Sequence, residues 1–221
     1  MQEDFHYKEV QTELPAERAL DVAATVANLI PLIGGPVASI LSSISGGRKE
    51  QRILEVIQGV SEDLRDFQST AAEEYVKTED FEELLENTLR IAAQERIEQK
   101  RRLFRNIVTR AIKHPGSDYE EQLRFVKTLE DLSLGHLVIL LALTMQPEPG
   151  LGIVGSPMQT LTQRVPDCAE AEIEHLVNEL NDRGITSLNS LRVMMTAHGA
   201  ADLRHAVTPY GQRFLAYIEA T

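Results

Sequence analysis

Apolar residues recur at helical spacing through the centre of the chain, and no glycine or proline lies between Gly59 and Pro115. In three segments these residues stand three or four positions apart, which places them on one face of an α-helix. The three stripes are Ile53, Ile57, Val60, Leu64 and Phe67; Phe81, Leu84, Leu85, Leu89 and Ala92; and Leu103, Phe104, Ile107, Val108, Ala111 and Ile112. Between Ala93 and Leu103 only Ile97 is apolar, so the pattern predicts a bend or break there.

Capping residues predict where further helices begin. A serine, threonine or aspartate at the N-cap accepts a hydrogen bond from the first turn, and proline fits the first helical position. Helix starts of this kind are predicted at Ser117-x-x-Glu120, Ser133, Ser156-Pro157, Asp167-x-x-Glu170 and Thr208-Pro209. The helix after Asp167 is expected to end near Gly184. Its buried face is predicted to carry Ile173, Leu176, Val177 and Leu180.

The segment from Val22 to Gly47 contains no charged residue, although a quarter of the chain is Asp, Glu, Lys or Arg. A spanning helix needs about 20 continuous apolar residues, and Pro31 and the Gly34-Gly35-Pro36 cluster divide this segment into two shorter pieces. We therefore expect an apolar helical hairpin over residues 20–46, buried in a helical bundle. A hairpin that inserts into a membrane after a trigger is the alternative.

The second half of the chain reads as helix, Pro/Gly-rich loop, short helix, turn, helix, two strands and a final helix. The two strands are expected at residues 191–196 and 204–208, around AHGAAD. This order, with the phrase HAVTPYGQRFL at the step into the last helix, resembles the winged helix-turn-helix superfamily over about residues 132–221. The predicted fold is mainly α, with a helical bundle at 1–131 followed by a winged-helix-like domain at 132–221 that carries a small two-stranded wing.

Charge is strongly segregated along a chain whose net charge is −12. Residues 71–95 carry a net charge of −6, and residues 96–113 carry +6. Arg101, Arg102 and Arg105 belong to the basic block and lie mostly opposite its apolar stripe. The simplest interpretation is a bundle helix whose polar face pairs with the preceding acids. A basic amphipathic helix that lies on a membrane or in a partner's groove is the alternative.

The resemblance to winged helices raises DNA binding, in which the second helix of the motif enters the major groove. Here that helix covers about residues 168–183, and residues 167–186 carry six acids against Arg183. Such a face is repelled by phosphates, so protein contact is the favoured use of the domain. Arg164, Arg192, Arg204 and Arg213 are the residues that remain for a smaller basic surface.

No catalytic or cofactor motif is present: the chain lacks G-x-x-x-x-G-K-[ST], G-x-S-x-G and H-E-x-x-H. The six histidines are dispersed, and the single cysteine, Cys168, suits a reducing cytoplasm. We therefore expect a cytoplasmic, non-enzymatic regulatory or adaptor protein without cofactor, metal or small-molecule substrate, which binds a protein partner or itself. A DNA-binding regulator and a membrane-perturbing effector using residues 22–47 are the alternatives. The candidate interaction surface consists of Glu170, Glu174, His175, Asn178, Arg101, Arg102 and Arg105.

Overall fold

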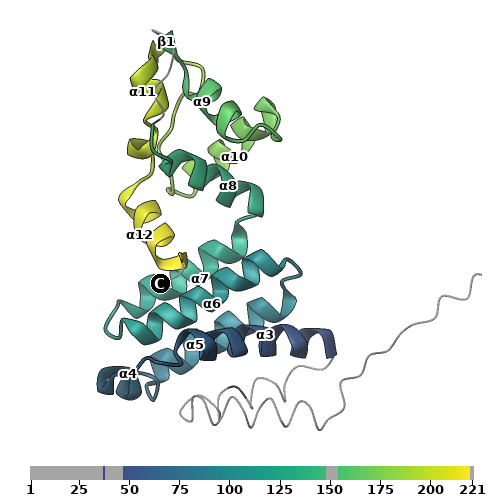
Figure 1. Cartoon of the computed structure of the whole chain (residues 1–221), viewed down its shortest axis with the longest axis vertical. Coiled ribbons are helices and arrows are strands. Elements are labelled where there is room, and N and C mark those ends of the chain that lie inside the picture. Colours follow the sequence, from purple (N-terminus) through teal and green to yellow (C-terminus); the bar gives the residue numbers. More distant parts are fainter. Residues whose placement is uncertain (1–36, 38–46, 148–153, 220–221) are drawn as a thin grey trace, which may run out of the picture. The chain divides into compact units, whose positions relative to one another are not determined.

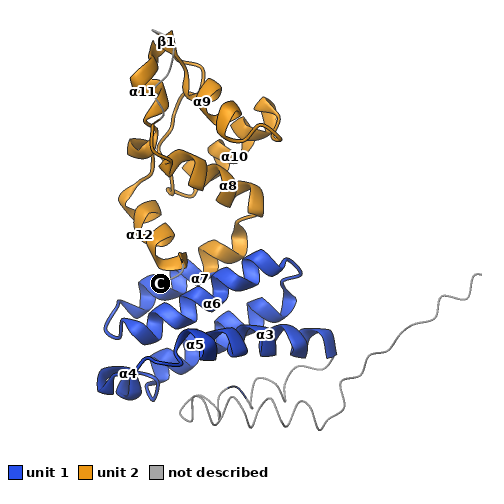
Figure 2. Cartoon of the chain, viewed as in Figure 1, with its two compact units in different colours: residues 1–126 blue, residues 127–221 orange. Residues whose placement is uncertain are grey.

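The computed structural model describes residue 37 and residues 47–147 and 154–219. These residues form ten α-helices, one short 3-10 helix and one two-stranded antiparallel sheet (Figure 1), which confirms the predicted mainly α fold class. The chain divides into two compact units, residues 1–126 and residues 127–221 (Figure 2). The division falls inside helix α7, Tyr119–Asp131. The predicted hairpin at 20–46 lies outside the described residues except for Val37, which is buried.

Among the described residues of unit 1, four helices precede α7. They are α3 (Gly47–Asp63), α4 (Thr70–Tyr75), α5 (Glu79–Gln94) and α6 (Glu98–Lys113). Helix α3 packs against both α5 and α6, and α5 packs against α6. The three predicted apolar stripes meet in this core, where the largest fully buried side chains include Ile53, Ile57, Phe81, Leu84, Leu85, Leu89, Phe104 and Ile107. Leu64 and Phe67 lie past the end of α3 and stay half-buried.

Serine and threonine caps interrupt the stretch that lacks glycine and proline. The hydroxyl of Ser69 accepts a hydrogen bond from the Ala72 amide and starts α4. The hydroxyl of Thr78 accepts from the Phe81 amide and starts α5. The predicted break near Ile97 is confirmed, since α5 ends at Gln94 and α6 begins at Glu98. A serine or threonine whose hydroxyl caps the first turn of a helix can thus separate that helix from the preceding one, and no glycine or proline is needed.

The helices of unit 2 begin largely where the sequence predicts. They are α8 (Leu134–Thr144), α9 (Pro157–Arg164), α10 (Glu170–Asp182), α11 (Ala197–Ala201) and α12 (Pro209–Ile218), with a 3-10 turn at Arg204–Ala206. Ser133, Ser156 and Thr208 are the N-caps of α8, α9 and α12, as predicted. The predicted buried face of α10, ending in Leu180, is also confirmed.

Two predicted caps are wrong by one or two residues. The carboxylate of Asp118 accepts from the amides of Glu120 and Glu121, whereas the Ser117 hydroxyl donates to the carbonyl of His114. Helix α10 has Ala169 at its N-cap, without a side-chain cap, so Asp167 does not close a capping box. Neighbouring cap candidates compete for the same amides, and the geometry of the preceding turn decides between them.

The sheet of unit 2 pairs strands other than the predicted ones. Strand β2 (Met195–Thr196) lies within the predicted segment 191–196, but its partner is β1 (Val154–Gly155). Residues 204–206 form the 3-10 turn, Val207 makes only an isolated bridge with Thr186, and the AHGAA segment is helix α11. The hairpin between 191–196 and 204–208 is therefore not formed. The two-stranded sheet instead joins the loop before α9 to the segment before α11.

Candidate interaction surfaces

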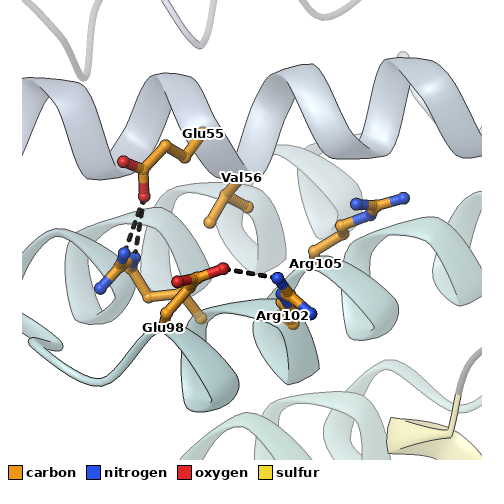
Figure 3. Close-up of a pocket in the computed structure, with 6 residues that line it drawn as sticks. Glu55, Val56, Glu98, Arg102 and Arg105 are labelled. Atoms are coloured by element: carbon orange, nitrogen blue, oxygen red, sulfur yellow. Dashed lines mark hydrogen bonds and ion pairs between the residues drawn. The ribbon is translucent and has the colours of Figure 1, made fainter.

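The three arginines of the candidate surface in unit 1 line one groove. It lies between α3 and α6, has a volume of about 350 Å³, and is lined by Glu55, Val56, Glu98, Arg101, Arg102 and Arg105. Figure 3 shows Glu55 and Val56 on α3 facing Glu98 and Arg102 on α6. The groove therefore combines a buried apolar side chain, Val56, with charged groups of both signs.

Arg101 is the most enclosed of the three arginines, with a side chain only 11% exposed. Its guanidinium donates to Glu55 Oε2 at 2.8 and 3.2 Å. It also donates to the carbonyls of Glu95 and Arg96, at 3.3 and 3.0 Å, where the chain turns from α5 into α6. Because its donors are satisfied inside unit 1, Arg101 fixes the geometry of the groove.

Arg105 is held by a two-point ion pair with Asp63 at the end of α3. Its Nε donates to Asp63 Oδ2 at 2.6 Å, Nη2 donates to Oδ1, and the Thr109 hydroxyl donates to Oδ2 at 3.1 Å. The hydrogen bond from Arg105 lowers the pKa of Asp63, and the same bond raises the pKa of Arg105. The arginine side chain crosses α3 at Gly59, where an added Cβ would stand 2.5 Å from Arg105 Cδ.

Arg102 is the arginine most open to solvent. Its side chain is 70% exposed and pairs at 2.6 Å with Glu98, one turn earlier on α6, which is itself 62% exposed. An exposed pair of this kind contributes about 0.3–0.5 kcal/mol, so a competing anion can replace Glu98 easily. Arg102 is thus the lining residue best able to form a new contact.

The expected pairing of the basic helix with the acidic block at 71–95 holds for Lys100, whereas two of the groove arginines pair with other acids. The groove arginines Arg101 and Arg105 pair with Glu55 and Asp63 of α3, although the sequence suggested the acidic block at 71–95. That block contributes Glu95 at its last position, which pairs with the buried Lys100 at 3.0 Å. Helix α3 packs against α6, as α5 also does, and Glu55 and Asp63 of α3 lie within reach of Arg101 and Arg105.

The four candidate residues of unit 2 lie on α10 and are exposed. Glu170 and Glu174 both pair with Arg192, at 2.9 and 3.3 Å. His175 stands 3.6 Å from Glu179, whose other oxygen is 2.6 Å from the buried His136 of α8. Three of the predicted contact residues therefore have charged partners within unit 2, and Asn178 is exposed on the same helix.

The arginines proposed for a smaller basic surface are occupied by partners in unit 2. Arg164 donates to the carbonyls of Ala142, Gln146 and Ala201, so it joins the ends of α8 and α11. Arg192 is neutralised by two glutamates and Arg204 by Asp202, which it contacts at 2.7 Å. Arg213 donates to the Pro209 carbonyl at 3.3 Å. The ion pairs thus neutralise Arg192 and Arg204, whereas the carbonyls hold the side chains of Arg164 and Arg213 in place without cancelling their charge.

A further apolar surface, not predicted from the sequence, lies on α8. Val138, Leu141 and Met145 are 46%, 49% and 47% exposed and stand three and four residues apart, on one face. Helix α8 is apolar on all sides and contains no Asp, Glu, Lys or Arg. The segment after Ser133, LGHLVILLAL, is strongly apolar in sequence, but only tertiary packing shows which side is exposed. Val154, Val193 and Met194, beside the sheet, are also exposed.

The described part of the chain, 47–147 and 154–219, offers no group of three or more His, Cys, Asp or Glu that could hold a metal ion. Cys168 is a free, half-buried thiol, and burial raises its pKa, which disfavours the reactive thiolate. Within the same residues, no helix has both the length and the apolar character needed to cross a membrane.

Comparison with known proteins returned no match. No protein-family model, no curated protein and no solved structure is significantly similar to this chain.

Proposed function

We propose that this chain is a non-enzymatic regulatory or adaptor protein of the cytoplasm that acts through protein–protein contacts. The observation that carries the proposal is the uncovered face of α8, formed by Val138, Leu141 and Met145. A helix that is apolar all round is normally covered on every side, and an exposed apolar face is typical of an interaction site.

The remaining surfaces support contact with protein over contact with DNA. We interpret unit 2 as a winged-helix-like domain, and the order α8, α9, α10, β2 and α12 supports that interpretation. Its α10 face is acidic, and its arginines Arg164, Arg192 and Arg204 are held by internal partners. In unit 1, the groove between α3 and α6 presents Arg102, which is suited to the carboxylate of a partner's side chain.

Photo-crosslinking in cells that contain the protein tests the proposal. Benzoylphenylalanine placed at Leu141 is expected to give protein adducts on irradiation. The same group at Gln163, an exposed polar position on α9, serves as the matched control and is expected to give none.

Two results would contradict the proposal. One is the absence of protein adducts at Leu141 under conditions in which the full-length chain is present and folded. The other is saturable, salt-sensitive binding of purified protein to a labelled DNA duplex at about 50 mM salt, since phosphate contacts produce that salt dependence.

A further inference from the structure

The methionines of unit 2 differ in their access to solvent. Met145, directly after α8, is 47% exposed, and Met194, directly before β2, is 62% exposed. Met158 on α9 is 3% exposed and lies in the core, and Met195 is half-buried. Peroxide in solution reaches an exposed thioether more readily than a buried one, so Met145 and Met194 are the methionines of this unit most open to oxidation.

Met145 is part of the exposed apolar face of α8. It follows Leu141 by four residues and Val138 by seven, and these intervals place the three side chains on one side of the helix. Met194 lies outside α8, at the sheet. Of the two open methionines, Met145 alone belongs to the surface that carries the proposed function.

Arginines hold the backbone on both sides of Met145. Arg164 donates to the carbonyl of Ala142 at 2.6 Å and to that of Gln146 at 3.3 Å. Arg204 donates to Gln146 Oε1 at 3.1 Å. These bonds use atoms other than the Met145 side chain, so a chemical change at its sulfur leaves them in place. Such a change is therefore expected to alter the chemistry of the face and to keep its fold.

We propose that Met145 is a site of reversible oxidation by hydrogen peroxide, which weakens the contact of the α8 face with its protein partner. The proposal rests on the proposed function, because it names the regulation of that surface. The sulfur of Met145 takes one oxygen atom from the peroxide, so the thioether is oxidised to a sulfoxide and the peroxide is reduced to water. Methionine sulfoxide reductase with a dithiol reverses the step and yields the thioether, a disulfide and water.

The sulfoxide suits an apolar contact less well than the thioether does. Methionine is flexible and polarisable and packs against apolar partners, whereas the oxygen of a sulfoxide accepts hydrogen bonds from water. A partner that covers the face removes this water, and α8 carries no Lys or Arg that could replace it. We expect the affinity of the partner to fall at least about fivefold.

Peptide mass spectrometry of purified full-length protein tests the chemistry. The chain carries Cys168→Ser, so that the remaining sulfurs are those of methionine. After a brief treatment with hydrogen peroxide, Met145 and Met194 are expected to be oxidised at least about tenfold faster than the buried Met158. Oxidation of Met145 at the slow rate of Met158 overturns the proposal.

Photo-crosslinking tests the effect of oxidation on the contact. The same chain with benzoylphenylalanine at position 141 is oxidised, freed of peroxide with catalase and irradiated in an extract of the cells that contain the protein. Only this chain has then met peroxide. The adduct formed by the untreated chain is expected to fall at least about fivefold after oxidation and to return after treatment with the reductase and dithiothreitol.

Substitutions at the two exposed methionines assign the effect to one sulfur. Met145→Leu keeps the face apolar and removes the sulfur, so the adduct should survive peroxide, whereas Met194→Leu should give no protection. Met145→Gln places a polar group on the face without any oxidant and should lower the adduct at least about fivefold. Met194→Gln is the matched control and should leave it unchanged. Circular dichroism of each variant establishes that the fold is kept.

The outcomes separate this inference from the function beneath it. If oxidised Met145 leaves the adduct at position 141 unchanged, or if Met145→Leu fails to protect it, the inference is overturned and the proposed function stands. If the untreated chain gives no protein adduct at position 141, both proposals fail.

Discussion

Gly59 and Arg105 offer a test of the packing between α3 and α6, because they are predicted to depend on each other. In an ordinary helix, replacing glycine with alanine stabilises the fold by about 0.5–1 kcal/mol. Here a Cβ at position 59 would stand 2.5 Å from Arg105 Cδ and 2.7 Å from Nε, so the arginine must move. The same side chain makes the two-point pair with Asp63, and the move breaks it.

The expected effect follows from the exposure of that pair. Arg105 and Asp63 are 29% and 26% exposed, so the pair is worth less than a fully buried one, and we take its loss as about 1–2 kcal/mol. Gly59→Ala is therefore expected to be neutral to destabilising by about 1 kcal/mol. In an Arg105→Ala background, the same substitution should stabilise by about 0.5–1 kcal/mol, because the space is then free.

The native chain, Gly59→Ala, Arg105→Ala and the double variant form a double-mutant cycle. Urea unfolding of each full chain, followed by hydrogen exchange of peptides from α3 and α6, measures its free energy of unfolding. The expected coupling free energy between the two positions is about 1–2 kcal/mol. Additivity to within about 0.3 kcal/mol, or a clear gain from Gly59→Ala in the native background, would refute the reasoning.

Two further predictions concern a carboxylate and a close backbone approach. Since Arg105 lowers the pKa of Asp63, the stability this pair contributes is fully present above the ordinary value of about 3.9 and is lost as the pH falls through the lowered value. The difference in free energy of unfolding between the native chain and Asp63→Asn should thus be constant from about pH 7 to 5 and shrink below about pH 4. The control is Asp66→Asn at an exposed position, whose free energy of unfolding should stay close to that of the native chain. Gly211→Ala should destabilise unit 2 by about 2 kcal/mol or more in urea unfolding, because its Cβ would stand 2.3 Å from the Ile185 carbonyl oxygen, and native-like stability would contradict this.

Predictions that depended on neighbouring residues were the most accurate. The caps Ser133, Ser156 and Thr208 and the buried face of α10 were readable because capping and helical periodicity act within a few residues. Ser69 and Thr78 show the limit of that approach, since each starts a helix inside a segment that seemed continuous. Serine and threonine are also common at positions that cap no helix, so whether either acts as an N-cap depends on the turn before it.

Predictions that depended on distant partners were the least accurate. Residues 204–208 had suitable strand composition, but β2 pairs with Val154–Gly155 across about forty residues. The basic helix α6 was matched to the acids nearest in sequence, whereas Arg101 and Arg105 pair with Glu55 and Asp63. Short strands and surface charges carry no information on which segment lies beside them.

The sequence by itself therefore determined the helical class, several helix starts and the side chains that form the cores, because these follow from local hydrogen bonding and from the spacing of apolar residues. Only the tertiary structure decided that three arginines share a groove with α3, that Arg192 and Arg204 pair with carboxylates of unit 2, and that α8 keeps one apolar face exposed. Charge pairing and burial are properties of neighbours in space, and packing alone brings those neighbours together.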